Sequence, residues 1–191
     1  MNDTEQVIRN AFSNAGVRDA HVFPGLPPND WAHHASEYYS ECLCYEPLPP
    51  LLLPFETDDY VHDILIHAGS GAAKKNWPID RFAALAGTFA AQGRSVEWIR
   101  GPAEEQLHIP ADARTLQVSS VVTLARHLTG TALCIGNDSG VTHLAAACAC
   151  KTIAIFGPTD PQVWAPRGDH VTIAAREGWP KLDDVRSLIQ R

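Results

Sequence analysis

The second part of the chain alternates between short apolar runs and segments in which apolar side chains recur with helical spacing. The apolar runs predict strands at 63–67, 96–99, 116–118, 131–136, 152–156 and 171–173. The patterns between and after them predict a helix from Pro78 to just before Gly93, a short acidic helix after Pro102, a helix capped by Ser119 or Ser120, and helices at 140–149 and 182–189. This alternation is typical of an α/β fold, a parallel sheet with helices on both faces.

The N-terminal residues follow a different pattern. Helical spacing covers 4–15, and a short strand is predicted at 17–23. A second helix is predicted to be capped by Asn29 or Asp30 and to end near Leu43. A lone strand between two helices has no sheet partner, so this segment resembles the end of another domain rather than a domain of its own.

A proline-rich segment separates the two patterns. Residues 47–54 read Pro-Leu-Pro-Pro-Leu-Leu-Leu-Pro, which excludes both regular elements and indicates a stiff, extended linker. The predicted organisation is therefore a remnant of another domain at 1–46, a linker at 47–60, and a self-sufficient α/β domain at 61–191.

Composition excludes several classes of function. The formal net charge of −7 disfavours non-specific binding to nucleic acid or to acidic membranes. No apolar run approaches the roughly 20 residues of a membrane-spanning helix, and the start of the chain lacks a signal-peptide pattern, so a cytoplasmic location is predicted. The five cysteines lack the Cys-x-x-Cys spacing of zinc sites, the histidines are scattered and Asp-x-Asp is absent, so no metal site is predicted.

Polar segments follow two of the predicted strands, and they are the first candidates for a ligand-binding site. Asp138-Ser139-Gly140-Val-Thr-His143 follows the strand at 131–136, and Asp138 or Ser139 can cap the next helix. The free N–H groups of that helix favour an anion. Gly157–Pro161 follows the strand at 152–156, and strand ends of a parallel sheet meet at the edge where ligands bind. We therefore expect a site for a nucleotide diphosphate or a similar donor, the alternative being a capped helix with a surface histidine.

A glycine-rich loop with two lysines follows the strand at 63–67. It reads His67-Ala-Gly-Ser-Gly-Ala-Ala-Lys74-Lys75-Asn-Trp-Pro78, and small residues before lysines at a helix start can hold a phosphate. It matches neither the P-loop pattern nor the dinucleotide fingerprint. A flexible turn with solvated lysines remains the alternative.

Two further features are weaker candidates. Glu104 and Glu105 follow the strand at 96–99, where a carboxylate can accept the hydroxyls of a ribose, although a solvated helix start would look the same. Trp164 and Arg167 are candidates to cover a sugar or base, and Trp164 fits a core position as well.

Four segments also keep the order and spacing of a known family. They are Ile64–Gly71 with Lys75–Phe82, Gly136–Ala146, Phe156–Pro161 and Trp164–Gly168. Together they resemble the C-terminal, donor-binding half of glycosyltransferase family 9, the lipopolysaccharide heptosyltransferases. The resemblance covers about residues 61–175 and departs from the family at Ala68, where proline is usual. Residues 1–58 are more weakly similar to the end of the family's N-terminal domain and its linker.

The resemblance implies the C-terminal, Rossmann-like domain of a GT-B fold, preceded by a remnant of the N-terminal acceptor domain. It implies inverting transfer of heptose from an ADP-sugar, which is a substrate and not a cofactor, to lipopolysaccharide core. By the same resemblance, Lys75 would neutralise the pyrophosphate, and Ser139 and Gly140 would donate backbone N–H groups to it. Asp138 and His143 would contact donor-sugar hydroxyls or phosphate.

The remaining residues of the expected donor site come from the loops. Ser70 would lie by the phosphates, and Glu104 (or Glu105, because the register is uncertain) would hold the ribose. The expected supporting loop residues are Gly69, Gly71, Gly157, Thr159 and Asp160.

The family's first Rossmann-like domain, which carries the catalytic carboxylate base, has no counterpart in residues 1–58. No catalytic residue is therefore assigned, and the base is expected in a separate N-terminal domain or chain. The expected partners are the nucleotide sugar, the lipopolysaccharide core acceptor and that N-terminal part, with a location in the cytoplasm or at the inner face of the membrane. Two alternatives stay open: a non-catalytic or split-enzyme module that binds nucleotide sugars, and another GT-B-like enzyme such as a sugar-nucleotide epimerase.

Overall fold

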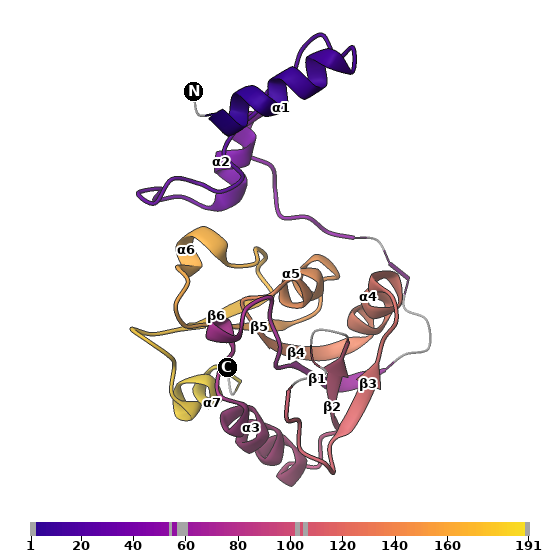
Figure 1. The fold of residues 1–191 in the computed structure, drawn as a ribbon. Helices are drawn as coiled ribbons and strands as arrows, with labels where there is room; N and C mark the ends of the chain where they lie inside the picture. Colours follow the sequence, from indigo (N-terminus) through magenta and orange to yellow (C-terminus); the bar gives the residue numbers. More distant parts are fainter. Residues whose placement is uncertain (1–2, 54, 57–60, 102–103, 105–106, 190–191) are drawn as a thin grey trace. The chain divides into compact units, whose positions relative to one another are not determined.

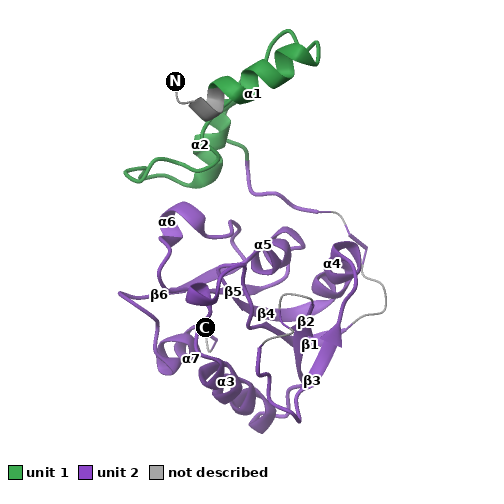
Figure 2. Ribbon diagram, in the orientation of Figure 1, with its two compact units in different colours: residues 1–48 green, residues 49–191 purple. Residues whose placement is uncertain are grey.

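The chain consists of two compact units. The computed structural model describes residues 3–53, 55–56, 61–101, 104 and 107–189. Residues 1–48 form the N-terminal unit and residues 49–191 form the α/β unit (Figure 2). The division falls inside the proline-rich segment.

The α/β unit is built on a six-stranded parallel sheet with the order β3-β2-β1-β4-β5-β6 (Figure 1). The strands are β1 His62–His67, β2 Val96–Arg100, β3 Arg114–Gln117, β4 Thr131–Asn137, β5 Thr152–Phe156 and β6 Val171–Ala175. The predicted parallel α/β sheet is confirmed, with β3 lying slightly earlier than expected. This is the strand order of Rossmann-like folds, and the order reverses between β1 and β4, where such sheets bind ligands at the carboxyl ends of the strands.

Helices cover both faces of the sheet (Figure 1). They are η1 Ala73–Lys75, α3 Ile79–Ala91, α4 Val121–Thr129, α5 Gly140–Ala147, α6 Pro161–Trp164 and α7 Leu182–Ile189. One buried cluster joins Ile64 and Ile66 to α3 and α7, and a second joins Leu65 to α4 and α5. Successive side chains of β1 therefore enter opposite cores, which is why this strand is apolar at adjacent positions.

Several helix ends are set by local chemistry. The Ser120 side chain accepts from the Thr123 N–H at the start of α4, so Ser120 is the cap and Ser119 is not. Helix α5 ends at Ala147 and not at 149, because Ala149 adopts a left-handed backbone with φ of 57°. The short acidic helix expected after Pro102 falls largely outside the described residues.

The N-terminal unit holds α1 Asp3–Asn14 and α2 Ala35–Cys42. The strand predicted at 17–23 is wrong: this segment is irregular, and the Ala20 carbonyl accepts from the Arg9 guanidinium instead of a neighbouring strand. The predicted cap at Asn29 or Asp30 is also wrong. The His34 imidazole caps α2 by accepting from the Ser36 N–H at 3.2 Å.

No helix in the described part of the chain has the length and apolar character needed to cross a membrane. The described residues also include no group of three or more His, Cys, Asp or Glu side chains that could hold a metal ion.

Two histidines and a glutamate form a hydrogen-bonded row at the amino-terminal end of the sheet. Nδ1 of His62 lies 2.9 Å from Oε1 of Glu97, and Nε2 of His62 lies 2.9 Å from Nδ1 of His127. Only one proton can lie between the two imidazoles, so the row accommodates one extra proton but not two.

Lowering the pH is expected to destabilise the chain through His127, because the folded chain binds a proton at this imidazole less readily than the unfolded chain does. Burial, reinforced by the neighbouring His62 and opposed by Glu97, holds the pKa of His127 below its usual 6.5. The unfolded chain then takes up this proton more readily than the folded chain. The contribution is complete above pH 6.5 and is lost as the pH falls through the lowered pKa, by at most about 1.4 kcal/mol per pH unit.

Urea unfolding at about pH 7.5 and about pH 5.5 measures this loss in the wild type and in His127→Gln. The variant should lose less stability between the two pH values. His108→Gln, at an exposed histidine, is the matched control and should behave as the wild type. An equal loss in the wild type and His127→Gln would contradict the assignment.

Candidate functional site

A pocket of about 680 Å³ opens at the carboxyl edge of the sheet in the α/β unit. Its polar side is formed by residues from the ends of β1 and β2 and the start of α5: His67, Ser70, Glu104, Ser139, Gly140 and His143. Its apolar side comes from the linker, from the segment after β3, from α4 and from α5: Leu51, Leu53, Val118, Val121, Leu124 and Leu144. The pocket thus joins a polar floor to an apolar wall, the usual make-up of a site for a small organic ligand.

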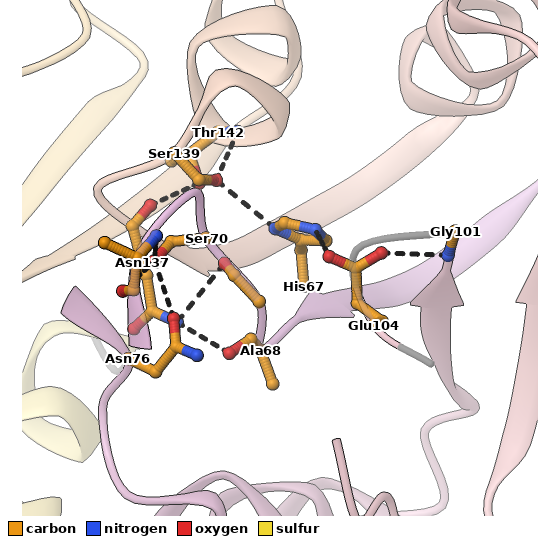
Figure 3. Close-up of polar contacts among 11 residues, drawn as sticks. His67, Ala68, Ser70, Asn76, Gly101, Glu104, Asn137, Ser139 and Thr142 are labelled. Atoms are coloured by element: carbon orange, nitrogen blue, oxygen red, sulfur yellow. Dashed lines mark hydrogen bonds and ion pairs between the residues drawn. The ribbon is translucent and has the colours of Figure 1, made fainter. Parts of the chain in front are cut away.

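Glu104 lies buried at the floor of this pocket and is held from two sides. Its Oε1 lies 2.9 Å from Nε2 of His67, and its Oε2 accepts from the Gly101 N–H at 2.9 Å (Figure 3). The hydrogen bond from His67 lowers the pKa of Glu104, against the opposing effect of burial. The carboxylate is therefore ionised, and Nε2 of His67 must carry a hydrogen.

Ser139 links this pair to the start of α5. Its hydroxyl caps the helix by accepting from the Thr142 N–H, and its Oγ lies 3.2 Å from Nδ1 of His67 (Figure 3). The cap at Ser139 is thus confirmed, and the alternative cap at Asp138 is wrong. Ser139 and Gly140 line the pocket, so the positive end of the α5 dipole faces it.

Asn137, at the end of β4, fixes the loop that follows β1. Its side-chain Nδ2 donates to the Ala68 carbonyl at 2.8 Å, and its Oδ1 accepts from the Trp77 N–H at 2.9 Å. Asn137 is fully buried, as are both loop residues that it binds. This bridge holds the glycine-rich loop, including Ser70, against the strand ends (Figure 3).

A second polar cluster lies next to Ser139 in the chain. The Lys75 Nζ donates to Oδ2 of Asp138 at 3.0 Å, and the Thr159 hydroxyl donates to the same oxygen at 2.8 Å. The three predicted site residues are thus brought together, although none of them lines the pocket. Their contact with a donor remains a prediction.

The other predicted residues lie as follows. Ser70 lines the pocket, and its hydroxyl bonds within its own loop, to Asn76 at 2.7 Å. His143 is exposed at the pocket wall. Asp160 caps α6 by accepting from the Gln162 N–H. Gly69 and Gly71 belong to the loop after β1, and Glu105 lies outside the described residues.

Gly157 has a packing role that sequence reasoning did not anticipate. A Cβ at this position would lie 2.5 Å from the ring of Trp179, so glycine is needed for the close contact with that ring. Gly157 does not line the pocket, and neither do Trp164 and Arg167, which were candidates to cover a sugar or base.

Sequence reasoning assigned no role to His67 or to the apolar wall. His67 is the last residue of β1. The polar segment after β4 was predicted as a site because it lies at the end of a strand, and the same criterion could have identified His67. The wall at Val118 and Val121 also follows a strand end, that of β3, but apolar residues at a helix start give no sequence signal of a ligand.

Comparisons with known proteins agree with this architecture. A sequence model of the family described as glycosyltransferase family 9 (heptosyltransferase) matches residues 55–188. The chain is 29% identical over 153 residues to lipopolysaccharide heptosyltransferase 1 of Pseudomonas aeruginosa, an alignment that covers 70% of this chain and 42% of the relative.

Solved structures show the same fold. The Escherichia coli heptosyltransferase WaaC with ADP superposes with a TM-score of 0.64 at 21% identity, covering 84% of this chain and 57% of the other. WaaC with ADP-2-deoxy-2-fluoro heptose gives 0.58 at 22% identity, covering 81% and 53%. The chain thus spans about half the length of the relatives that it matches. From the family match over most of its length, the chain belongs to glycosyltransferase family 9.

Proposed function

We propose that the chain is the donor-binding part of a glycosyltransferase that binds an ADP-sugar, with heptose as the sugar, for inverting transfer to lipopolysaccharide core. Membership of family 9 supports this, as do the names of the relatives and the complexes of WaaC with ADP and with an ADP-heptose analogue. We place this activity in the cytoplasm or at the inner face of the membrane.

The observation that carries the proposal is the make-up of the pocket. Glu104 supplies an ionised carboxylate that can accept the two hydroxyls of a ribose, as carboxylates do in other nucleotide folds. The start of α5, at Ser139 and Gly140, supplies N–H groups and a dipole for a phosphate. The apolar wall can cover a base. A nucleoside diphosphate needs these three features in one pocket.

Binding of this kind contributes to catalysis by stabilising the leaving group. Negative charge grows on the diphosphate as the sugar departs, and the α5 N-terminus and Lys75 are placed near it in this proposal. Glu104 is already bound by His67 and by Gly101, so it is not a free base for the acceptor hydroxyl. We propose that the base comes from a further part of the enzyme.

A second candidate is a nucleotide-sugar binding module without transfer activity. Among the described residues that line the pocket, Glu104 is the only carboxylate, and its binding by His67 and Gly101 favours this alternative. Both candidates require donor binding, and a transfer assay with ADP-heptose and a core acceptor separates them. Product formed by this chain alone would exclude the module.

Replacing Lys75 with alanine is expected to weaken binding of ADP-ribose by about tenfold or more and to change adenosine binding little. The substitution removes a cation beside the proposed diphosphate site and leaves the buried Asp138 carboxylate without its ion pair, which repels an anion. Calorimetric titration with the two ligands measures the difference.

Asp138→Asn is the comparison variant, because it removes the negative charge and leaves Lys75 as a cation. It should weaken ADP-ribose binding less than Lys75→Ala does. If Lys75→Ala weakened the binding of both ligands equally, the proposed role of Lys75 at the diphosphate would be wrong. If the wild type bound no nucleoside diphosphate, the proposed function itself would be refuted.

A further inference from the structure

We propose that His67 is a proton-linked positioning residue of the donor pocket, which takes up a proton from solvent when an anionic diphosphate binds. The inference rests on the proposed function and deepens it, because it assigns a charge-balancing role to a side chain that holds both Glu104 and Ser139.

The hydrogen bonds around His67 define its state before the proton is taken up. Glu104 can only accept, so Nε2 of His67 donates to it at 2.9 Å. The Thr142 hydroxyl donates to the Asn137 carbonyl at 2.6 Å, so it has no proton to offer Ser139. With neutral His67, the Ser139 hydroxyl donates to Nδ1 at 3.2 Å. Every group in this row is then satisfied.

The same row accepts one more proton without breaking a contact. Once Nδ1 of His67 is protonated, it donates to the Ser139 Oγ across the same 3.2 Å. The Ser139 hydroxyl then turns to the Thr142 Oγ1, which lies 3.1 Å away and can still accept. One rotation of a hydroxyl therefore compensates for the change in protonation, so the folded structure holds His67 in either state.

The charges around the pocket give a reason for coupling to an anion. Among the described residues that line it, the titratable ones are His67 at the end of β1, Glu104 after β2 and His143 on α5. The described lining from β3 and α4 is uncharged. Of the charged groups nearest to Ser139, Lys75 already neutralises Asp138. No lysine or arginine among the described residues lines the pocket. Apart from the Lys75 cation beside the proposed diphosphate site, a proton on an imidazole of the lining is therefore the way to add positive charge against a bound diphosphate.

Titration calorimetry with ADP-ribose tests the inference, because both of its phosphates stay ionised over the range used. Titrations in two buffers with different heats of ionisation, between about pH 6.5 and about pH 8, give the number of protons taken up. The wild type should take up a fraction of one proton. Its affinity should fall with rising pH, by at most about tenfold per unit.

Three variants locate the proton. His67→Gln retains a donor for Glu104 but cannot be protonated, and it should bind without proton uptake and with an affinity independent of pH. His143→Gln changes the other imidazole of the pocket and should still take up the proton. His108→Gln, at an exposed histidine outside the pocket, should match the wild type. Proton uptake that persists in His67→Gln, or is abolished in His143→Gln, would overturn the inference.

Imidazole ¹⁵N resonances of the wild type provide a second readout if His67→Gln fails to fold. ADP-ribose should convert one histidine from the Nε2–H form to the doubly protonated form. No such conversion, with ADP-ribose bound, would refute the inference and leave the proposed function intact. Absence of ADP-ribose binding to the wild type would count instead against the proposed function.

Discussion

Replacement of Asn137 by alanine is expected to lower the free energy of unfolding by about 3 kcal/mol or more. The asparagine side chain bridges β4 and the loop after β1, through the Ala68 carbonyl and the Trp77 N–H. Both partners are buried, with 2% and 1% of their surface exposed. Without the amide, each is left without this partner away from water, at a cost of about 1–3 kcal/mol per group. Denaturant unfolding, with its slope checked for two-state behaviour, measures the loss.

Asn76→Ala is the matched control for this prediction. Asn76 belongs to the same loop and is only half-buried, and its amide oxygen accepts from the Ser70 hydroxyl. Its loss should cost about 1 kcal/mol or less, since water can replace the contact. If Asn137→Ala lost no more stability than Asn76→Ala, the bridge would contribute little.

The sheet was largely predictable because its strands lie inside the protein. Ile64 and Leu65 are adjacent and equally buried, but they enter different cores, so the strand reads as a continuous apolar run. The connecting helices show the usual apolar stripe, as at Phe82, Leu85 and Phe89 on α3.

The N-terminal unit was less predictable because its local signals have no tertiary support. Residues 17–23 carry strand-forming side chains, but no neighbouring strand pairs with them. The start of α2 is capped by a histidine, which lies outside the usual set of capping residues, and the nearby Asn29 and Asp30 gave a misleading signal.

The candidate site was predictable at strand ends and not beyond them. Ser70, Ser139 and Gly140 follow apolar strands, and the structure places all three at one pocket. The role of His67 depends on Glu104, which is 37 positions away in sequence, and on Ser139, which is 72 positions away. No local pattern encodes such contacts. The pairing of Lys75 with Asp138, 63 positions apart, is hidden in the same way.

Replacing Gly69 with alanine is expected to weaken ADP-ribose binding by about tenfold to a hundredfold while leaving the fold intact. A Cβ at this position would overlap the Oε1 atom of Glu104. That atom is the movable end of a side chain, so the carboxylate can swing away from His67 instead of disrupting the backbone. A charge-assisted hydrogen bond to a ribose hydroxyl, at about 1.5–3 kcal/mol, would then be lost.

Gly71→Ala is the comparison in the same loop, because a Cβ there meets no atom within 4 Å and the glycine does not have a left-handed backbone. Like Gly69→Ala, this variant restricts the backbone of the loop, but it does not displace Glu104. It should therefore lose less affinity for ADP-ribose than Gly69→Ala does. A ligand comparison separates carboxylate from loop effects. The wild type should bind ADP more tightly than 2′-deoxy-ADP. The Gly69→Ala variant should bind the two ligands almost equally, because the displaced Glu104 carboxylate no longer accepts a hydrogen bond from the 2′-hydroxyl. An unchanged preference for ADP in Gly69→Ala would show that Glu104 does not hold the ribose.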